Sequence, residues 1–264
     1  MLELTSLYRY AVKSCRGERL HQSSVTEMGL SFDRHWMVAD EEGHMLTGRD
    51  EPRLVHVAAI AEEDGEALQL GAPGMHDLHV SRHALCIEQP AKVWRDEFVA
   101  WGGYSPANAW LSQFLGRSVQ LLHIGEHSRR HSEKRPHLQL SFADSYPLLL
   151  LNTASLEDLN KRVGRDMEIG RFRPNLVVSG AEAFAEDAWQ RLRIGDVTFV
   201  VEKPCERCVF TTVDPLTAER SADQEPLRTL GKFRKQPGGV MFCMNLRAEK
   251  AGELTVGMPV EVLE

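Results

Sequence analysis

The sequence has no long apolar run, few cysteines and no excess of positive charge. Its longest apolar run, residues 146–151, is far shorter than the roughly 20 residues that cross a bilayer, and the N-terminus does not read as a secretory signal. Five cysteines spread over 264 residues do not form a disulfide framework. A net charge of −7 argues against a nucleic-acid-binding surface. We therefore predict a globular cytoplasmic protein without a membrane or nucleic-acid partner.

Short apolar runs alternate with turn signals along much of the chain. Leu2–Leu7 and Trp36–Ala39 are typical of strands, and residues 40–43 are typical of a hairpin turn. One helix is predicted to begin at Ser105-Pro106 and to end at Gly116. We expect a mainly β fold with short helices, of the α+β class.

A basic, helix-breaking stretch, residues 127–136, follows the first half of the chain. Its histidines have no regular spacing, so a solvated linker is favoured over a metal site. This composition shift indicates a domain boundary or a mobile loop.

The most distinctive stretch chemically is residues 203–215, where Arg207 stands between Cys205 and Cys208. A nearby cation stabilises a thiolate, so this stretch indicates thiol redox chemistry or soft-metal binding. A thioredoxin-type dithiol would open a helix, whereas the β-branched residues 209–213 predict a strand. A structural zinc site needs a second ligand pair, which the sequence does not offer. A further interpretation of this stretch stays open, in which it is a hairpin that carries two buried core cysteines.

Polar residues also stand at other strand ends. Lys13 and Ser14 follow the first predicted strand, Arg34 enters another, and residues 171–175 (Arg-Phe-Arg-Pro-Asn) precede a third. An arginine at such a position can bind a phosphate or carboxylate through two hydrogen bonds. Taken alone, Lys13, Ser14 and Arg34 are more typical of a solvated loop than of a ligand contact, and for residues 171–175 the two interpretations are about equal.

Three motifs in this order and spacing resemble the MOSC family, named for the C-terminal domain of molybdenum cofactor sulfurases. They are residues 171–175, residues 194–196 (Ile-Gly-Asp) and residues 205–213. The chain resembles, over nearly its whole length, the bacterial relatives of the mitochondrial amidoxime-reducing component. The resemblance implies an N-terminal β-barrel-like domain, residues 1–120, packed on a β-barrel MOSC domain, residues 125–264.

The resemblance also implies a molybdenum cofactor (Mo-molybdopterin) with Cys208 as the metal ligand. Pyridoxal phosphate is not expected. Cys243 stands where relatives tend to have glycine. Contributions from both domains would place the site at their interface. The implied cofactor contacts are Lys13, Ser14, Arg34, Ser145, Arg173, Asn175 and Arg207.

The implied reaction is the reduction of a small N-hydroxylated substrate to its amine, amidine or base, with the oxygen leaving as water. Electrons are expected from an external donor of the ferredoxin, flavoprotein or cytochrome type. Asp144 is the candidate proton donor or substrate anchor, and it is equally typical of a turn cap. Two alternatives stay open: a sulfur carrier with a persulfide on Cys205 or Cys208, and a non-catalytic dithiol switch.

Overall fold

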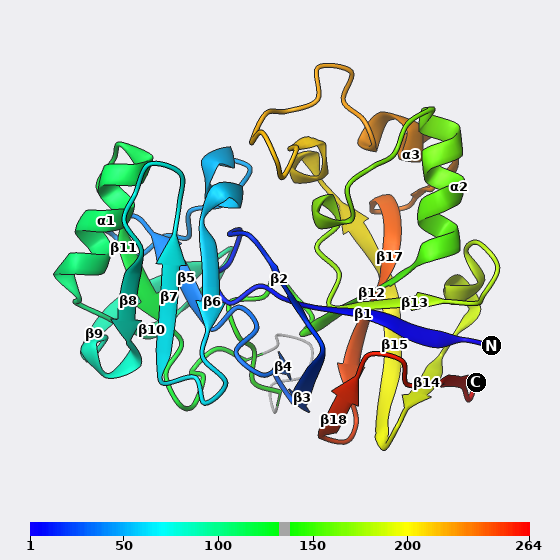
Figure 1. Ribbon diagram of the computed structural model, residues 1–264, viewed down its shortest axis with the longest axis horizontal. Helices are drawn as coiled ribbons and strands as arrows, with labels where there is room; N and C mark the ends of the chain where they lie inside the picture. Colours follow the sequence, from blue (N-terminus) through cyan, green and yellow to red (C-terminus); the bar gives the residue numbers. More distant parts are fainter. Residues whose placement is uncertain (132–137) are drawn as a thin grey trace.

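The computed structural model describes residues 1–131 and 138–264. Residues 132–136 of the predicted linker therefore lie outside the described residues. The rest of the chain folds into four sheets and three α-helices within these ranges, as ordered in Figure 1.

The largest sheet has nine strands and draws on both halves of the chain. Its order is β19-β14-β15-β17-β12-β13-β1-β2, and β16 pairs with β17 beside this path. These strands are β1 (Glu3–Arg9), β2 (Glu18–Leu20), β12 (Leu148–Asn152), β13 (Leu176–Ser179), β14 (Arg191–Ile194), β15 (Val197–Arg207), β16 (Lys235–Gln236), β17 (Gly239–Ala248) and β19 (Val260–Val262). In Figure 1 the N-terminal strand β1 lies in the right-hand part of the molecule, where it pairs with β13.

Three smaller sheets complete the strands. One has the order β5-β11-β10-β9, a second β6-β7-β8, and a third β18-β3-β4. These strands are β3 (Gln22–Thr26), β4 (Gly29–Leu30), β5 (Trp36–Ala39), β6 (Ala58–Ala61), β7 (Ala67–Gly71), β8 (Leu78–Ser81), β9 (Ile87–Val93), β10 (Asp96–Gly102), β11 (Gln120–His123) and β18 (Gly252–Thr255).

The predicted fold class, mainly β with short helices, is confirmed. The sheets of the described residues are open paths with two edge strands, so the barrels implied by the resemblance are not closed. Strands from the first 30 residues also pair across the predicted domain division: β1 pairs with β13, and β3 pairs with β18. The boundaries 1–120 and 125–264 thus remain a prediction about the sequence.

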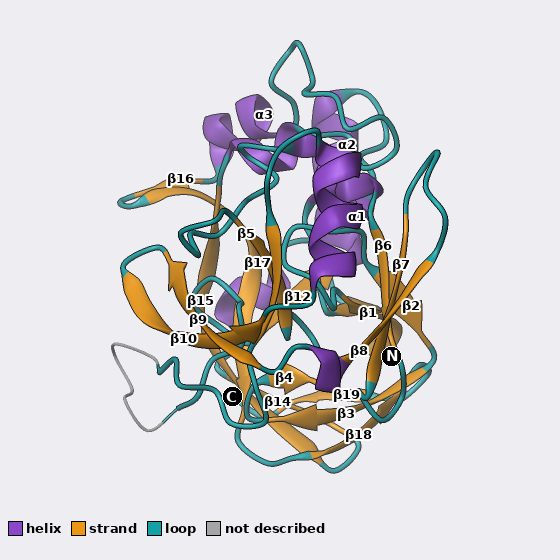
Figure 2. Ribbon diagram, turned by 90° about the vertical axis from the view of Figure 1, so that its left-hand side faces the viewer, coloured by secondary structure: helices purple, strands orange, loops and turns teal. Residues whose placement is uncertain are grey.

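The helices are α1 (Ser105–Leu115), α2 (Thr153–Val163) and α3 (Leu227–Phe233). In Figure 2 the strands fill the molecule, while α1 faces the viewer and α2 and α3 lie at the upper end. Gly116 ends α1 in the left-handed conformation, at φ 64°, as the sequence predicts. No described helix is long and apolar enough to cross a membrane.

Two separate apolar cores lie in the first and the second half of the chain. One surrounds the fully buried Trp36 and packs against α1 through Leu111. Another packs Phe172 against Phe242, with ring centroids 4.7 Å apart, beneath the strand that carries Cys205. Burial of large aromatic side chains is a strong source of stability. Both cores therefore give rigid support to the loops that meet between them.

Candidate functional site

A cavity of about 480 Å³ is lined by residues from both halves of the chain. The lining comes from the loop after β1, the loop before β5, the segment that leads into β12, the segment before β13, and the end of β15. All nine predicted site residues lie in this lining: Lys13, Ser14, Arg34, Asp144, Ser145, Arg173, Asn175, Arg207 and Cys208. The structure thus brings together residues that are far apart in the sequence.

Three of these residues have an unusual backbone conformation. Ser14, Arg34 and Arg173 have φ values of 66°, 54° and 55°, in the left-handed region that favours glycine. Such conformations cost of order 1 kcal/mol each and occur preferentially at ligand sites. Backbone hydrogen bonds hold the loops in place, including one from the amide of Arg34 to the carbonyl of Tyr10 at 2.9 Å.

Arg34 is held by acceptors on its own loop and in the second half. Its guanidinium donates to the buried Asp33 carboxylate, to Asn175 Oδ1 at 3.0 Å and to the carbonyl of Arg173 at 3.3 Å. The Asn175 amide donates in turn to the carbonyl of Tyr8 at 3.1 Å. These bonds connect the segments that carry Arg34 and Arg173.

Arg173 is less completely paired. Its Nη1 donates to the carbonyl of Cys15 at 2.6 Å, and its guanidinium lies 4.1 Å from the ring centroid of Tyr10. Its Nη2 is buried and has no hydrogen-bond partner among the described residues. Burial and the nearby charge of Arg34 lower the pKa of Arg173 to about 10, so it is still a cation at neutral pH.

Arg207 lies among the thiols at the end of β15. Its Nη1 donates to Cys205 Sγ at 3.2 Å and its Nη2 to the carbonyl of Phe172 at 3.0 Å, whereas its buried Nε has no partner in the described structure. Burial opposes the cation, but the neighbouring cysteine side chains Cys205, Cys243 and Cys208 outweigh it at the high pH where an arginine titrates and raise the pKa of Arg207. The guanidinium therefore pairs with Cys205, and Cys208 lines the cavity beside it.

Cys243 lies opposite this pair on β17. The register of β15 and β17 shifts between Pro204 and Glu206, and Cys243 has a φ of 68° at this irregularity. A left-handed residue in a bulge is normally glycine. This geometry suits a glycine, the residue that the resemblance predicts at this position. The buried Cys243 side chain packs against the same core as Cys205.

The segment after Cys208 corrects one prediction. Residues Val209–Thr212 form a short 3-10 helix rather than the predicted strand. Threonine hydroxyls favour this turn, because Thr211 Oγ1 donates to the carbonyl of Cys208 at 2.9 Å and Thr212 Oγ1 donates to the carbonyl of Val209 at 2.7 Å. Local side-chain hydrogen bonds thus override the β-branched propensity.

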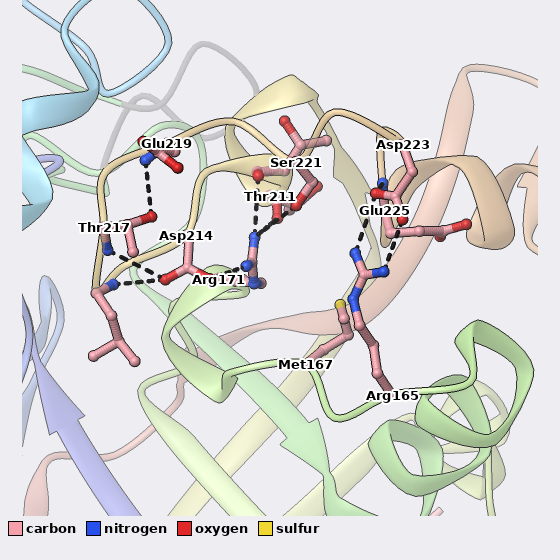
Figure 3. A network of polar contacts seen from close by, with 12 residues as sticks. Arg165, Met167, Arg171, Thr211, Asp214, Thr217, Glu219, Ser221, Asp223 and Glu225 are labelled. Carbon is pink, nitrogen blue, oxygen red and sulfur yellow. Dashed lines mark hydrogen bonds and ion pairs between the residues drawn. The ribbon is translucent and has the colours of Figure 1, made fainter.

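Arg171 fixes the chain that follows this turn. Its Nη1 donates to the carbonyl of Thr212 at 3.0 Å, and its Nη2 pairs with the Asp214 carboxylate at 2.5 Å. Figure 3 shows Arg171 reaching into this loop, with Arg165 pairing with Asp223 farther along it. Arg171 is buried, so it acts as a structural clamp for the loop after Cys208.

Asp144 lies at the cavity and has a side chain that is 63% exposed. Lys13 Nζ and Trp94 Nε1 both donate to Asp144 Oδ1, at 2.5 Å and 2.9 Å. Desolvation opposes ionisation, but the charge of Lys13 and these hydrogen bonds outweigh it and hold the pKa of Asp144 well below its usual range. Burial in turn lowers the pKa of Lys13.

Sequence reasoning missed Arg130, which lies in the predicted solvated linker. Its side chain is 2% exposed, and it pairs with Asp96 at 2.7 Å. It also donates to the carbonyls of Ser141, Ala143 and Asp144. Arg130 therefore holds the segment that carries Asp144. The sequence offers one signal, the two adjacent arginines Arg129 and Arg130 shortly before the segment that carries Asp144. The spacing does not indicate which of the two is buried.

The lining of the cavity has the composition of an anion-binding site. It contains seven basic residues and two acidic ones, although the whole chain carries a net charge of −7. Unpartnered buried guanidinium nitrogens occur on three of its arginines: Arg171, Arg173 and Arg207. Buried donors without partners are costly unless a ligand accepts from them. An anionic group with a phosphate and a soft metal for Cys208 fits this donor set.

Comparison with known proteins agrees with the motifs. Residues 1–118 match the MOSC N-terminal beta barrel domain, and residues 137–261 match the MOSC domain. The mitochondrial amidoxime-reducing component 1 of Mus musculus is 36% identical over 289 residues, covering 98% of this chain and 82% of the relative. The Danio rerio component 1 is 34% identical (97% and 83% covered). The Bos taurus component 2 is 35% identical (97% and 82% covered).

Proposed function

The chain belongs to the MOSC family, and from this premise we propose that it is a molybdenum-cofactor-dependent oxidoreductase that reduces N-hydroxylated compounds. Relatives named amidoxime-reducing components support the substrate class, and they align with nearly the whole chain. The observation that carries the proposal is the single cavity in which the Cys208 thiol lies among seven basic residues. Location in the cytoplasm remains a prediction from the sequence.

We propose that this chain holds the cofactor through its cations and Cys208. Arg173 and Arg207 offer unpartnered donors for the phosphate and pterin, and Arg34, which also bonds to Asn175, holds the backbone of Arg173 in place. Cys208 supplies the soft thiolate ligand. When bound, the cofactor supplies the two-electron chemistry that breaks an N–O bond.

Asp144 and Lys13 are proposed to act on the substrate. Because the pKa of Asp144 is held low, its carboxylate is ionised at neutral pH and favours an anchoring role over proton donation. Both of its hydrogen bonds within the described chain end on Oδ1, so Oδ2 can accept from the N–H or O–H of an amidoxime. Release of the oxygen as water consumes two protons. Lys13 Nζ, 2.5 Å from Asp144 and with a lowered pKa, is the proposed proton source.

The experiment is a reductase assay on protein from a host that makes the cofactor. Chemically reduced methyl viologen replaces the unknown protein donor, and conversion of benzamidoxime to benzamidine is followed by chromatography. The proposal expects benzamidine from the native protein and at least a tenfold lower kcat/KM for Asp144→Asn. Absence of benzamidine from molybdenum-loaded protein would contradict it.

The electron donor is proposed to be a separate protein of the ferredoxin, flavoprotein or cytochrome type. Replacing methyl viologen by each reduced donor in turn identifies the class that sustains turnover. If reduced methyl viologen supports reduction of the amidoxime but no ferredoxin, flavoprotein or cytochrome does, this part of the proposal is contradicted.

One observation favours a second candidate, thiol chemistry at Cys205. Arg207 donates to Cys205 Sγ at 3.2 Å, so a cation lies beside a thiol to which the proposed metal site assigns no role. A sulfur carrier would gain 32 Da per persulfide (about one sulfur atom), and a dithiol switch would form a reversible disulfide with Cys208. Intact-mass measurement before and after reduction distinguishes the two.

A further inference from the structure

Trp94 occupies a backbone position that does not suit it. The strands β9 and β10 pair from Val93 and Asp96, so Trp94 and Arg95 form a two-residue hairpin turn. Trp94 has a φ of 57°. This left-handed position of a hairpin turn favours asparagine, aspartate or glycine, and a bulky aromatic residue there is strained. Its presence calls for an explanation outside the turn itself.

The indole of Trp94 lies at the cavity in a fixed orientation. Its Nε1 donates to Asp144 Oδ1 at 2.9 Å, and the guanidinium carbon of Arg49 is 4.2 Å from its ring centroid. The side chain is nonetheless 41% exposed, among the few large apolar side chains that are. A hairpin of the first half thus holds an aromatic ring against the carboxylate of the second half.

The rest of the cavity does not account for this ring. Its basic residues suit an anionic cofactor, whereas the indole Nε1–H is already used by Asp144 and the electron-rich ring face does not attract an anion. An aromatic surface beside a hydrogen-bond acceptor suits a molecule that has a planar apolar part and a polar N–H or O–H group. These two features occur together in N-hydroxylated aromatic amidines and heterocyclic bases.

We propose that Trp94 forms a stacking subsite for the planar ring of the substrate, next to the anchoring carboxylate of Asp144. This inference rests on the proposed function and specifies its substrate class: aromatic and heteroaromatic N-hydroxylated compounds are preferred over aliphatic ones. Stacking on an aromatic side chain is worth roughly 1–3 kcal/mol per base, which corresponds to about 5-fold to 150-fold in affinity.

The test compares two variants and two substrates. Trp94→Leu removes the ring, whereas Trp94→Phe keeps a ring and loses only the Nε1 hydrogen bond to Asp144. Benzamidoxime carries an aromatic ring, and acetamidoxime carries a methyl group in its place. We expect Trp94→Leu to lower kcat/KM for benzamidoxime about tenfold more than Trp94→Phe does, mainly through KM, whereas the two variants, which both lose the hydrogen bond to Asp144, should change kcat/KM for acetamidoxime by the same factor. Trp94→Phe should keep most of the native preference.

Two results would overturn the subsite. One is an equal loss for both substrates in Trp94→Leu, and the other is identical behaviour of the Phe and Leu variants, because either result assigns Trp94 only to the placement of Asp144. Trp101 lies on the same hairpin but outside the cavity lining, so Trp101→Phe is the matched control. Circular dichroism verifies that each variant is folded.

A binding measurement separates this inference from the proposed function. Calorimetric titration with benzamidine and acetamidine needs no turnover. If neither amidoxime is reduced, the proposed function fails, and the titration still tests the subsite: tighter binding of benzamidine that is lost in Trp94→Leu supports it. Equal affinity of the native protein for the two amidines would overturn the subsite even if both amidoximes are reduced.

Discussion

Arg130 is predicted to be one of the most important side chains for stability near the site. Arg130→Met keeps much of the side-chain volume but removes the charge that pairs with Asp96 and the donors to the carbonyls of Ser141, Ala143 and Asp144. Asp96 is 37% exposed and stays hydrated without its partner, so the main cost comes from the three carbonyls that lose a donor, about 1–3 kcal/mol for each one that is buried. For a chain of this size each kcal/mol lowers the unfolding temperature by roughly 2–4 °C, so we expect a decrease of about 10 °C.

The neighbouring Arg129 provides a matched control. Its side chain is 52% exposed, and its 2.8 Å pair with Glu88 lies at the surface. Exposed pairs contribute about 0–1 kcal/mol, so Arg129→Met should lower the unfolding temperature by no more than a few degrees. Both variants are measured by thermal and urea unfolding at the same pH. Equal shifts for the two variants would refute the assignment of Arg130 as a buried clamp.

Two further predictions concern pH and the loop after Cys208. Burial lowers the pKa of His35 to about 4 and that of His123 to about 3, from 6.5, so both side chains are neutral in the folded protein near neutral pH. As the pH drops from 6.5 towards 4, these histidines take up protons in the unfolded chain before they do so in the folded one, so the stability of the fold decreases. Between pH 6.5 and 5 the loss is about 2 kcal/mol per histidine, and urea midpoints of the native protein and a His35→Gln/His123→Asn variant should diverge accordingly; parallel pH profiles would exclude this cause. Arg171→Met should release the loop drawn in Figure 3 and increase the rate at which trypsin cleaves it about tenfold, which corresponds to lowering the free energy of local opening by roughly 1.4 kcal/mol. Arg165→Met, which loses a half-exposed ion pair, should change this rate little. Equal cleavage rates in the two variants would contradict the role of Arg171.

Periodicity and motif order predict much of this molecule. The apolar run Trp36–Ala39 is a strand with these bounds, and the helix that ends at Gly116 follows the capping signals. Both signals are local, since they depend on neighbours within one turn or one strand. The residues of the cavity were identified through the family resemblance, because no local pattern indicates that Lys13 lies 2.5 Å from Asp144.

Three features escaped the sequence prediction, one for a local reason and two because of contacts between distant segments. Residues 209–212 have strand propensity, but the hydroxyls of their own threonines, together with Arg171, stabilise a 3-10 turn instead. Arg130 resembles a solvated linker charge in the sequence, because its acceptors lie in the segment 141–144. Trp94 gives no signal in the sequence, because its hydrogen-bond partner, Asp144, is 50 residues away. Burial and pairing across the chain decide the last two cases.

The most direct test of the proposed function is the molybdenum and pterin content of protein purified from a host that makes the cofactor. Elemental analysis and pterin fluorescence after oxidation are compared for the native chain, Cys208→Ser and Cys205→Ser. We predict near-stoichiometric molybdenum with pterin in the native chain, loss of molybdenum in Cys208→Ser and substantial retention in Cys205→Ser. A native chain without molybdenum, or equal retention in the two variants, would contradict the assignment of Cys208 as the metal ligand.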